Sequence, residues 1–319
     1  MGNQPAITQK QKPEAYQQLI DNTTPLGKYA STFGSGEVLR DNSDPKKYYF
    51  EITLPMKASV DADTFARELE FREKHSYPCL AQIHAHKQVL NSQCFADAHK
   101  VTFVMDYAIL TLYDAIKDRI DKLDGQLLPE EQAWFVFDKL ATGGKTLEDY
   151  KFFSGDLSPK TVLCFDNSGT SDLKIVEMSM VTPWRTSVER HREDSSYRAI
   201  FAPEQLENLR RGEFAELKVP IADVFAAGMT VLCTTFAENF EEFYNYTTYE
   251  LANDKIFKRI LKLKSEGYSD QFTDILVRCL TINPNERITF NELYNTIQDY
   301  LFPDRQRGPS VLIQNARRN

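Results

Sequence analysis

Cysteine and histidine side chains between residues 79 and 99 are the first candidates for chemistry, because these residue types bind metal ions. The set comprises Cys79, His84, His86, Cys94 and His99. His84 and His86 would share one face of a strand, but the closely spaced cysteine pairs of zinc modules are missing. The chain has five cysteines, an odd number, and they are scattered. We therefore expect free, mostly buried thiols in a reducing compartment, and no metal site.

Two further patterns could contact phosphate groups or metal ions. Gly143-Gly144-Lys145-Thr146 is similar to the end of a Walker A loop, but the first glycine of that motif would fall on Lys139 and the segment has helical periodicity. We therefore reject this interpretation. Asp156 and Glu177 lie in short loop-like segments. A loop aspartate usually caps or turns the backbone, whereas the carboxylate of Glu177 could bind a divalent ion as a hard oxygen ligand.

The elements that must position these residues change in character near residue 108. Strand-like segments dominate before this point, with one helix predicted at Asp61–His75. Helical periodicity dominates after it, as far as Leu301. We predict an α+β fold with a small β-rich N-lobe and a larger helical C-lobe. The predicted boundaries are an extended N-terminal arm at 1–27, the N-lobe at 28–107, the C-lobe at 108–302 and a C-terminal tail at 303–319.

Bulk composition excludes several classes of function. Hydrophobic residues make up 42% of the 319 residues and charged residues 26%, which is typical of a globular protein. A net charge of −8 argues against a general nucleic-acid binder, because the phosphate backbone favours positive surfaces. No apolar run approaches the roughly 18–20 residues that span a bilayer, and the N-terminus lacks the apolar core of a secretory signal. We therefore expect a cytoplasmic protein without stable membrane insertion.

Three short motifs follow one another in the C-terminal half: Ala202-Pro203-Glu204, Asp223–Gly228 and Asn283–Thr289. In order and spacing they resemble the A-P-E, D-x-W-x-x-G and D-P-x-x-R-x-T motifs of protein kinases, and Leu128–Leu163 resembles the kinase region that leads into the catalytic loop. The resemblance implies a bilobal protein-kinase-like fold. It also implies an ion pair between Glu204 and Arg287, and a catalytic-loop backbone held by Asp223.

The same resemblance assigns the charged groups that would position Mg·ATP. In Lys46–Ile52 the strand lysine of the family falls on Glu51, or on Thr53 after a shift. Tyr49 then occupies the small-residue position above adenine and would occlude it, and Glu68 is the expected helix glutamate. Glu51 and Glu68 would repel each other by roughly 4 kcal/mol at about 4 Å, so we expect no ion pair between them.

The nucleotide loop and the catalytic loop also depart from the family pattern. In the glycine-rich loop, Ser31 and Phe33 replace two glycines and only Gly36 is kept, so side chains would block close approach of phosphates. In the catalytic loop Asp156 keeps the base position, but Ser158 replaces the lysine and Thr161 the metal-binding asparagine. The D-F-G position reads Glu177-Met178-Ser179.

These departures predict a vestigial site: a catalytically inactive pseudokinase that does not bind ATP or Mg²⁺ and acts as a scaffold through protein partners. The polar ends of the chain would be disordered unless they were held. Ordered ends would indicate a larger assembly, such as a cytoskeletal or ciliary structure. Two alternatives remain open. One is a divergent active Ser/Thr-type kinase with Asp156 as base and Glu177 as metal ligand, and the other is an allosteric protein that binds nucleotide without turnover.

Overall fold

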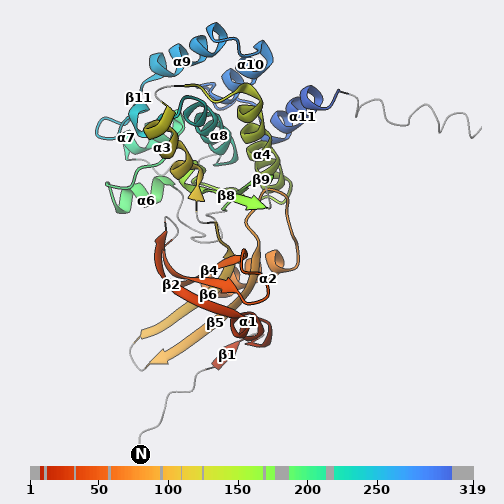
Figure 1. Ribbon diagram of the computed structural model, residues 1–319. Helices are drawn as coiled ribbons and strands as arrows, with labels where there is room; N and C mark the ends of the chain where they lie inside the picture. The colour runs from red at the N-terminus through yellow and green to blue at the C-terminus, as the bar shows by residue number, and fades with distance from the viewer. Residues whose placement is uncertain are drawn as a thin grey trace, which may run out of the picture.

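The computed structural model describes residues 8–10, 13–31, 34–56, 59–93, 96–108, 110–123, 126–167, 170–176, 187–212 and 219–303. The first seven residues and all but the first residue of the expected tail at 303–319 lie outside this part. The described chain forms two lobes, a β-rich N-lobe and a helical C-lobe (Figure 1). The α+β, bilobal kinase-like fold expected from the sequence is therefore present.

Within the described residues, six strands form one antiparallel sheet in the N-lobe, in the order β1-β5-β6-β4-β3-β2 (Figure 1). The strands are β1 (Thr8–Lys10), β2 (Thr23–Ser31), β3 (Gly34–Asp41), β4 (Tyr48–Met56), β5 (Ile83–Gln93) and β6 (Ala96–Asp106). Side chains of a strand alternate between the two faces of a sheet. In β4 this alternation gives Phe50 and Ile52 to one face and Tyr49 to the other, where they join separate clusters of buried residues.

A helix covers each face of this sheet. Helix α2 (Ser59–Glu73) packs Phe65 and Leu69 against Phe50 and Ile52 on the inner face. Helix α1 (Pro13–Asp21) packs Tyr16 on the outer face, beside Tyr49. The expectation of an extended arm over residues 1–27 is therefore wrong, because this segment contributes a strand and a helix. Proline has no N–H to lose at the first position of a helix, so Pro13 starts α1 instead of preventing it.

The C-lobe is built around one buried apolar helix. Almost all of α8 (Val219–Phe236) is buried, from Ala222 to Phe236. Among the described helices it alone is long and apolar enough to cross a membrane, but 83% of it is buried inside the protein, as expected for a core helix. The other described helices of the lobe are α3 (Leu112–Leu123), α4 (Glu130–Asp149), α6 (Ser187–Glu193), α7 (Pro203–Arg211), α9 (Asn253–Ser265), α10 (Asp270–Cys279) and α11 (Phe290–Leu301).

The glycine pair at 143–144 has a packing role inside α4. A Cβ on Gly143 would lie 2.6 Å from the Ile175 side chain, and a Cβ on Gly144 would lie 2.2 Å from the Phe290 ring. Both glycines let neighbouring elements approach the helix closely. This agrees with our rejection of a phosphate-binding loop at this position.

A small sheet lies in the C-lobe. Within the described chain it has the order β7-β8-β9. Its strands are β7 (Leu110–Thr111), β8 (Val162–Asn167) and β9 (Thr170–Ile175), and shorter pieces complete the lobe: η1 (Pro159–Thr161), η2 (Phe240–Phe243), β10 (Tyr244–Asn245) and β11 (Glu250–Leu251). Backbone hydrogen bonds join β9 to the segment after α2: Ala81 N–H donates to the Ile175 carbonyl (2.9 Å), and Ile175 N–H donates to the Cys79 carbonyl (2.8 Å).

Candidate active site

The loop at Ser154–Thr161 is fixed by hydrogen bonds at both ends. The N–H groups of Ser154 and Gly155 donate to the buried Asp223 carboxylate at 2.8–3.1 Å. Gly155 has φ +70°, a conformation that costs glycine nothing. At the other end, the Thr161 hydroxyl donates to the Asp156 carbonyl at 2.9 Å and accepts from Ser158 N–H at 3.0 Å. Thr161 stands where the family has asparagine. Its hydrogen bonds therefore stabilise the turn that carries Asp156.

Asp156 is enclosed at the centre of this loop and is only 2% exposed. Its Oδ2 accepts hydrogen bonds from Arg190 Nη1 (2.9 Å) and from the Tyr197 hydroxyl. Its Oδ1 is buried and has no hydrogen-bond partner within the described part of the chain. Burial raises the pKa of Asp156 to about 6, although the Tyr197 hydrogen bond and the Arg190 charge lower it. Both the position and the raised pKa of this carboxyl group suit a general base that acts near neutral pH.

Lys160 is a functional candidate that the sequence interpretation missed. It lies four residues after Asp156, and its charge lowers the pKa of that carboxyl. Its Nζ donates to Glu241 at 3.0 Å and lies 5.1 Å from the Tyr113 ring centre. The family pattern places a lysine two residues after the base, and Ser158 occupies that position here. The signal that could have identified Lys160 is a cation two residues further along the same loop.

The expected register of strand β4 is wrong by one residue. Tyr49 points to the outer face, where its hydroxyl donates to Asp41 at 2.9 Å and its ring lies 4.9 Å from that of His84. Glu51 shares this face by alternation, and burial raises its pKa. Neither side chain faces α2. Tyr49 therefore does not occlude an adenine site and Glu51 does not occupy the strand-lysine position, because a slip of one residue moves every side chain to the opposite face.

Aromatic rings occupy the inner face of the sheet next to the lobe boundary. Phe50 packs 6.4 Å from the Tyr29 ring and 5.7 Å from the Tyr107 ring. Gly36 faces this cluster, and a Cβ there would lie 2.4 Å from the Glu51 carbonyl and 2.7 Å from the Phe50 ring. Close packing of β3 on β4 therefore explains this glycine without any role in phosphate binding.

Several predicted site residues cannot be compared with the structure in full. Phe33 and Glu177 lie outside the described residues. Ser31 ends β2 and Glu68 lies in α2, but their side chains are not among those described. The expected close approach of Glu51 to Glu68 does not occur, because Glu51 lies on the sheet face that points away from α2.

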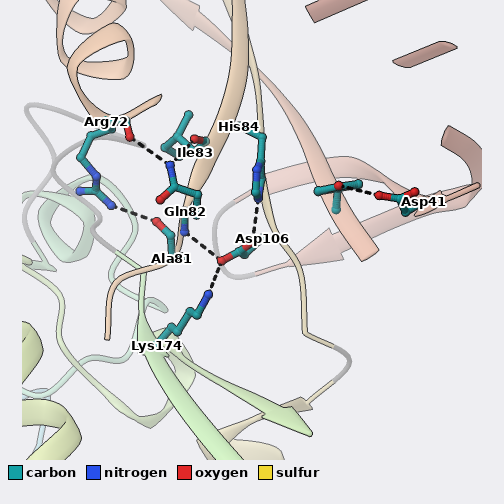
Figure 2. Close-up of polar contacts among 9 residues, drawn as sticks. Asp41, Arg72, Ala81, Gln82, Ile83, His84, Asp106 and Lys174 are labelled. Atoms are coloured by element: carbon teal, nitrogen blue, oxygen red, sulfur yellow. Dashed lines mark hydrogen bonds and ion pairs between the residues drawn. The ribbon is translucent and has the colours of Figure 1, made fainter. Parts of the chain in front are cut away.

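A second, partly buried carboxylate connects the two lobes. Asp106, the last residue of β6, accepts hydrogen bonds from His84 Nε2 (2.8 Å) on β5, from Lys174 Nζ (2.6 Å) on β9 and from Gln82 N–H (3.0 Å) (Figure 2). Burial raises the pKa of Asp106, but the His84 hydrogen bond and the Lys174 charge outweigh it and lower the pKa to about 2. Arg72 of α2 adds a hydrogen bond to the Ala81 carbonyl at 3.0 Å (Figure 2). The Lys174–Asp106 contact joins β9 of the C-lobe to the end of β6 in the N-lobe.

The C-lobe motifs come together as a structural cluster. Arg287 donates to Glu204 through both terminal nitrogens, at 2.7 and 3.0 Å, in the pairing that the resemblance implies. The third motif residue, Asp223, holds the catalytic loop from within α8. The framework around the loop is therefore complete in the described chain.

Comparison with known proteins gives a family and a fold. The family model for the protein kinase domain matches residues 57–297, well over half of the chain. Among solved structures, Rad53 (residues 1–466) in complex with AMP-PNP is similar, with a TM-score of 0.56 at 15% sequence identity. That alignment covers 87% of this chain and 65% of the Rad53 chain, so this chain spans less than two thirds of its length. A search of curated protein sequences finds no match.

These findings correct two expectations from the sequence. The statement that the chain is not an enzyme is wrong, because the protein kinase domain model matches through both lobes. The expectation of no cofactor, with ATP and Mg²⁺ excluded, is overturned by the same match. Among the charges expected to be missing, the β4 position depended on a register shifted by one residue, and Glu177 lies outside the described residues. The chain belongs to the protein kinase domain family.

Proposed function

We propose that this chain is a divergent Ser/Thr-type protein kinase that uses Asp156 as the general base. The observation that carries this proposal is the state of that carboxylate: it is buried, its loop is fixed at both ends, and one of its oxygens has no hydrogen-bond partner among the described residues. A buried polar atom without a hydrogen-bond partner costs free energy and calls for an explanation, such as a catalytic role or a bound ion. A role in structure alone would predict that both oxygens are satisfied.

Mg·ATP supplies the phosphoryl group when bound, and two of the described residues fit roles beside it. Asp156 Oδ1 fits as an oxygen ligand or proton acceptor, and Lys160 supplies a cation within electrostatic reach of it. Strand β4 contributes no lysine or arginine between Tyr48 and Met56. The positive charge that phosphate transfer requires must therefore come from another part of the chain, and Lys160 is the candidate next to the base.

In this proposal each side chain has a limited task. Asp156 Oδ1 accepts the proton of the acceptor hydroxyl, and the raised pKa of this carboxyl makes it a better base. Lys160 leaves Glu241 and neutralises negative charge beside the loop. Thr161 and Asp223 hold the loop backbone and thereby orient Asp156.

The test is transfer of labelled phosphate from ATP to a protein acceptor by the purified full chain. We expect measurable transfer that falls by about 10²- to 10⁴-fold in Asp156→Asn, the usual contribution of a general base. The matched control is Asp118→Asn, which makes the same chemical change at an exposed residue of α3 that pairs with Lys122.

A thermal shift with and without Mg·ATP measures binding separately from transfer. Equal transfer by Asp156→Asn and wild type would refute the assignment of the base. If neither saturating Mg·ATP nor any acceptor produced a response, the proposed function would fail.

A further inference from the structure

A surface cavity lies on the outer face of the N-lobe sheet, where α1 covers it, and is separate from the candidate active site. Its volume is about 710 Å³, within the roughly 300–1,000 Å³ that is typical of ligand pockets. The end of α1, the start of β2, the turn after β3 and one residue of β4 line it. We call it the α1 cavity, and the lining residues that matter below are Ala15, Asn22, Thr23, Asp41, Ser43 and Tyr49.

The charge around the α1 cavity is negative. The described residues that line it include one carboxylate, Asp41, and no lysine or arginine. Helix α1 ends beside it, and the described last turn of this helix holds no basic residue. The C-terminal end of a helix carries a partial negative charge, because its last carbonyls lack N–H partners within the helix. The electrostatic potential in the cavity therefore favours a cation.

Asp41 is ionised and keeps one free position for a hydrogen bond. Its Oδ1 accepts from the Ser43 hydroxyl (2.6 Å), the Ser43 N–H (2.8 Å) and the Asp44 N–H (3.3 Å), which close the turn. Its Oδ2 accepts one hydrogen bond from the described residues, from the Tyr49 hydroxyl at 2.9 Å. The hydrogen bonds of Ser43 lower the pKa of Asp41 to about 2. Because each carboxylate oxygen has two lone pairs, Oδ2 can accept one more donor.

The other polar groups of the cavity also offer acceptors. The hydroxyls of Thr23, Ser43 and Tyr49 all donate to acceptors of the protein, at 2.6–2.9 Å. A hydroxyl has a single hydrogen, so these three can present only lone pairs to a ligand. Asn22 Nδ2 donates to the Gln18 carbonyl at 2.8 Å, which leaves Asn22 Oδ1 as an acceptor. A ligand that satisfies this cavity must therefore bring several donors and a positive charge.

We propose that the α1 cavity binds a guanidinium group, as carried by arginine, with Asp41 Oδ2 and Asn22 Oδ1 as acceptors. A guanidinium has five N–H donors in a planar fork and stays charged, so it can reach separated acceptors at once. An ammonium group has its three donors on one atom and matches such a set less well. The same chemistry is available from free arginine and from an arginine side chain in a peptide.

Lys47 is a competing cation of the chain itself. Its Nζ lies 5.1 Å from the Tyr49 ring centre, although Lys47 does not line the cavity. The hydrogen bond with Tyr49 and the charge of Asp41 raise the pKa of Lys47. An incoming guanidinium has to share the field of Asp41 with this ammonium group. The Lys47→Met variant should therefore bind the ligand about two- to fivefold more tightly than wild type.

The test is an NMR titration of the amide signals of the full chain with Nα-acetyl-arginine methylamide. We expect saturable shifts at residues 18–23 and 41–44, with a Kd on the order of millimolar. Nα-acetyl-citrulline methylamide has nearly the same shape without the charge and should bind at least about tenfold more weakly. Free arginine is the second arm. Binding more than tenfold tighter than that of the blocked form supports a free amino acid as the source, and equal binding supports a side chain in a peptide.

Asp41→Asn removes the charge at nearly constant size and should weaken binding by about tenfold or more. The matched control is Asp44→Asn, in the same turn but outside the cavity lining, where the carboxylate accepts from the Lys46 N–H at 3.0 Å. It should change the Kd less than twofold. Equal weakening by the two variants would overturn the proposal.

A blocking variant tests the cavity without touching its carboxylate. Ala15 is an exposed residue of α1 that lines the cavity, so Ala15→Phe should abolish the saturable shifts while the melting temperature stays near that of wild type. Gln17→Phe places the same ring on an exposed position of this helix outside the lining and should bind normally. Citrulline binding as tight as arginine binding, or no saturable shift in wild type, would show that the cavity is no guanidinium site.

Discussion

Replacing Arg287 by alanine removes a buried cation that five hydrogen bonds hold in place. Arg287 is fully buried at its side chain, whereas Glu204 keeps 19% exposure. Its donors reach both oxygens of Glu204 and the carbonyls of Thr281, Ile221 and Ile282, at 2.7 to 3.2 Å. The substitution leaves one carboxylate and three carbonyls without these donors.

Breaking a buried ion pair by removing one partner costs about 3–5 kcal/mol. Because Glu204 can still contact water, we expect a loss near the lower end, about 3 kcal/mol in the free energy of unfolding. For a chain of 319 residues, with about 2.1 cal/mol/K of unfolding entropy per residue, that corresponds to a fall in Tm of roughly 4–5 °C. Urea denaturation and thermal melting followed by circular dichroism measure both quantities.

Two comparisons make the Arg287 result specific. Glu204→Gln keeps an acceptor oxygen, so it should cost less than Arg287→Ala. Lys122→Ala removes an exposed ion pair with Asp118 on α3 and should change stability by less than about 1 kcal/mol. A loss below about 1 kcal/mol for Arg287→Ala would refute the reasoning, because the pair would then behave like a surface contact.

Three further outcomes are expected. Lys160→Met should lower kcat for phosphate transfer by at least about tenfold while its melting temperature stays near that of wild type, since the loss of the partly exposed pair with Glu241 costs little. Gly36→Ala should destabilise the N-lobe by about 1–3 kcal/mol in urea denaturation, because the new Cβ would overlap the Glu51 carbonyl and the Phe50 ring. The pKa of Asp156, raised from 3.8 to about 6, predicts that kcat rises with pH through about 6 as the base loses its proton. The native state then binds more protons than the unfolded state between these values, so the contribution of Asp156 to stability should fall as pH rises from about 4 to 6. This slope should be absent from the melting curves of Asp156→Asn.

The C-lobe could be predicted from the sequence because its motifs are short and contiguous. Glu204, Asp223 and Arg287 each stand in a segment whose neighbours identify it, and the distances along the chain between them are characteristic. Their contacts then follow from the fold that the motifs imply. The two-lobed α+β architecture rests on the same order, together with the change from strand to helix periodicity near residue 108.

Strand β4 could not be placed in register by pattern alone. Its sequence alternates Tyr49, Glu51 and Thr53 with Phe50, Ile52 and Leu54, and both sets begin with an aromatic residue. Helices cover both faces of this sheet, so a buried aromatic residue fits either side. Only tertiary packing distinguishes the two registers. Every role assigned to a residue of this strand therefore carried the same shift of one residue.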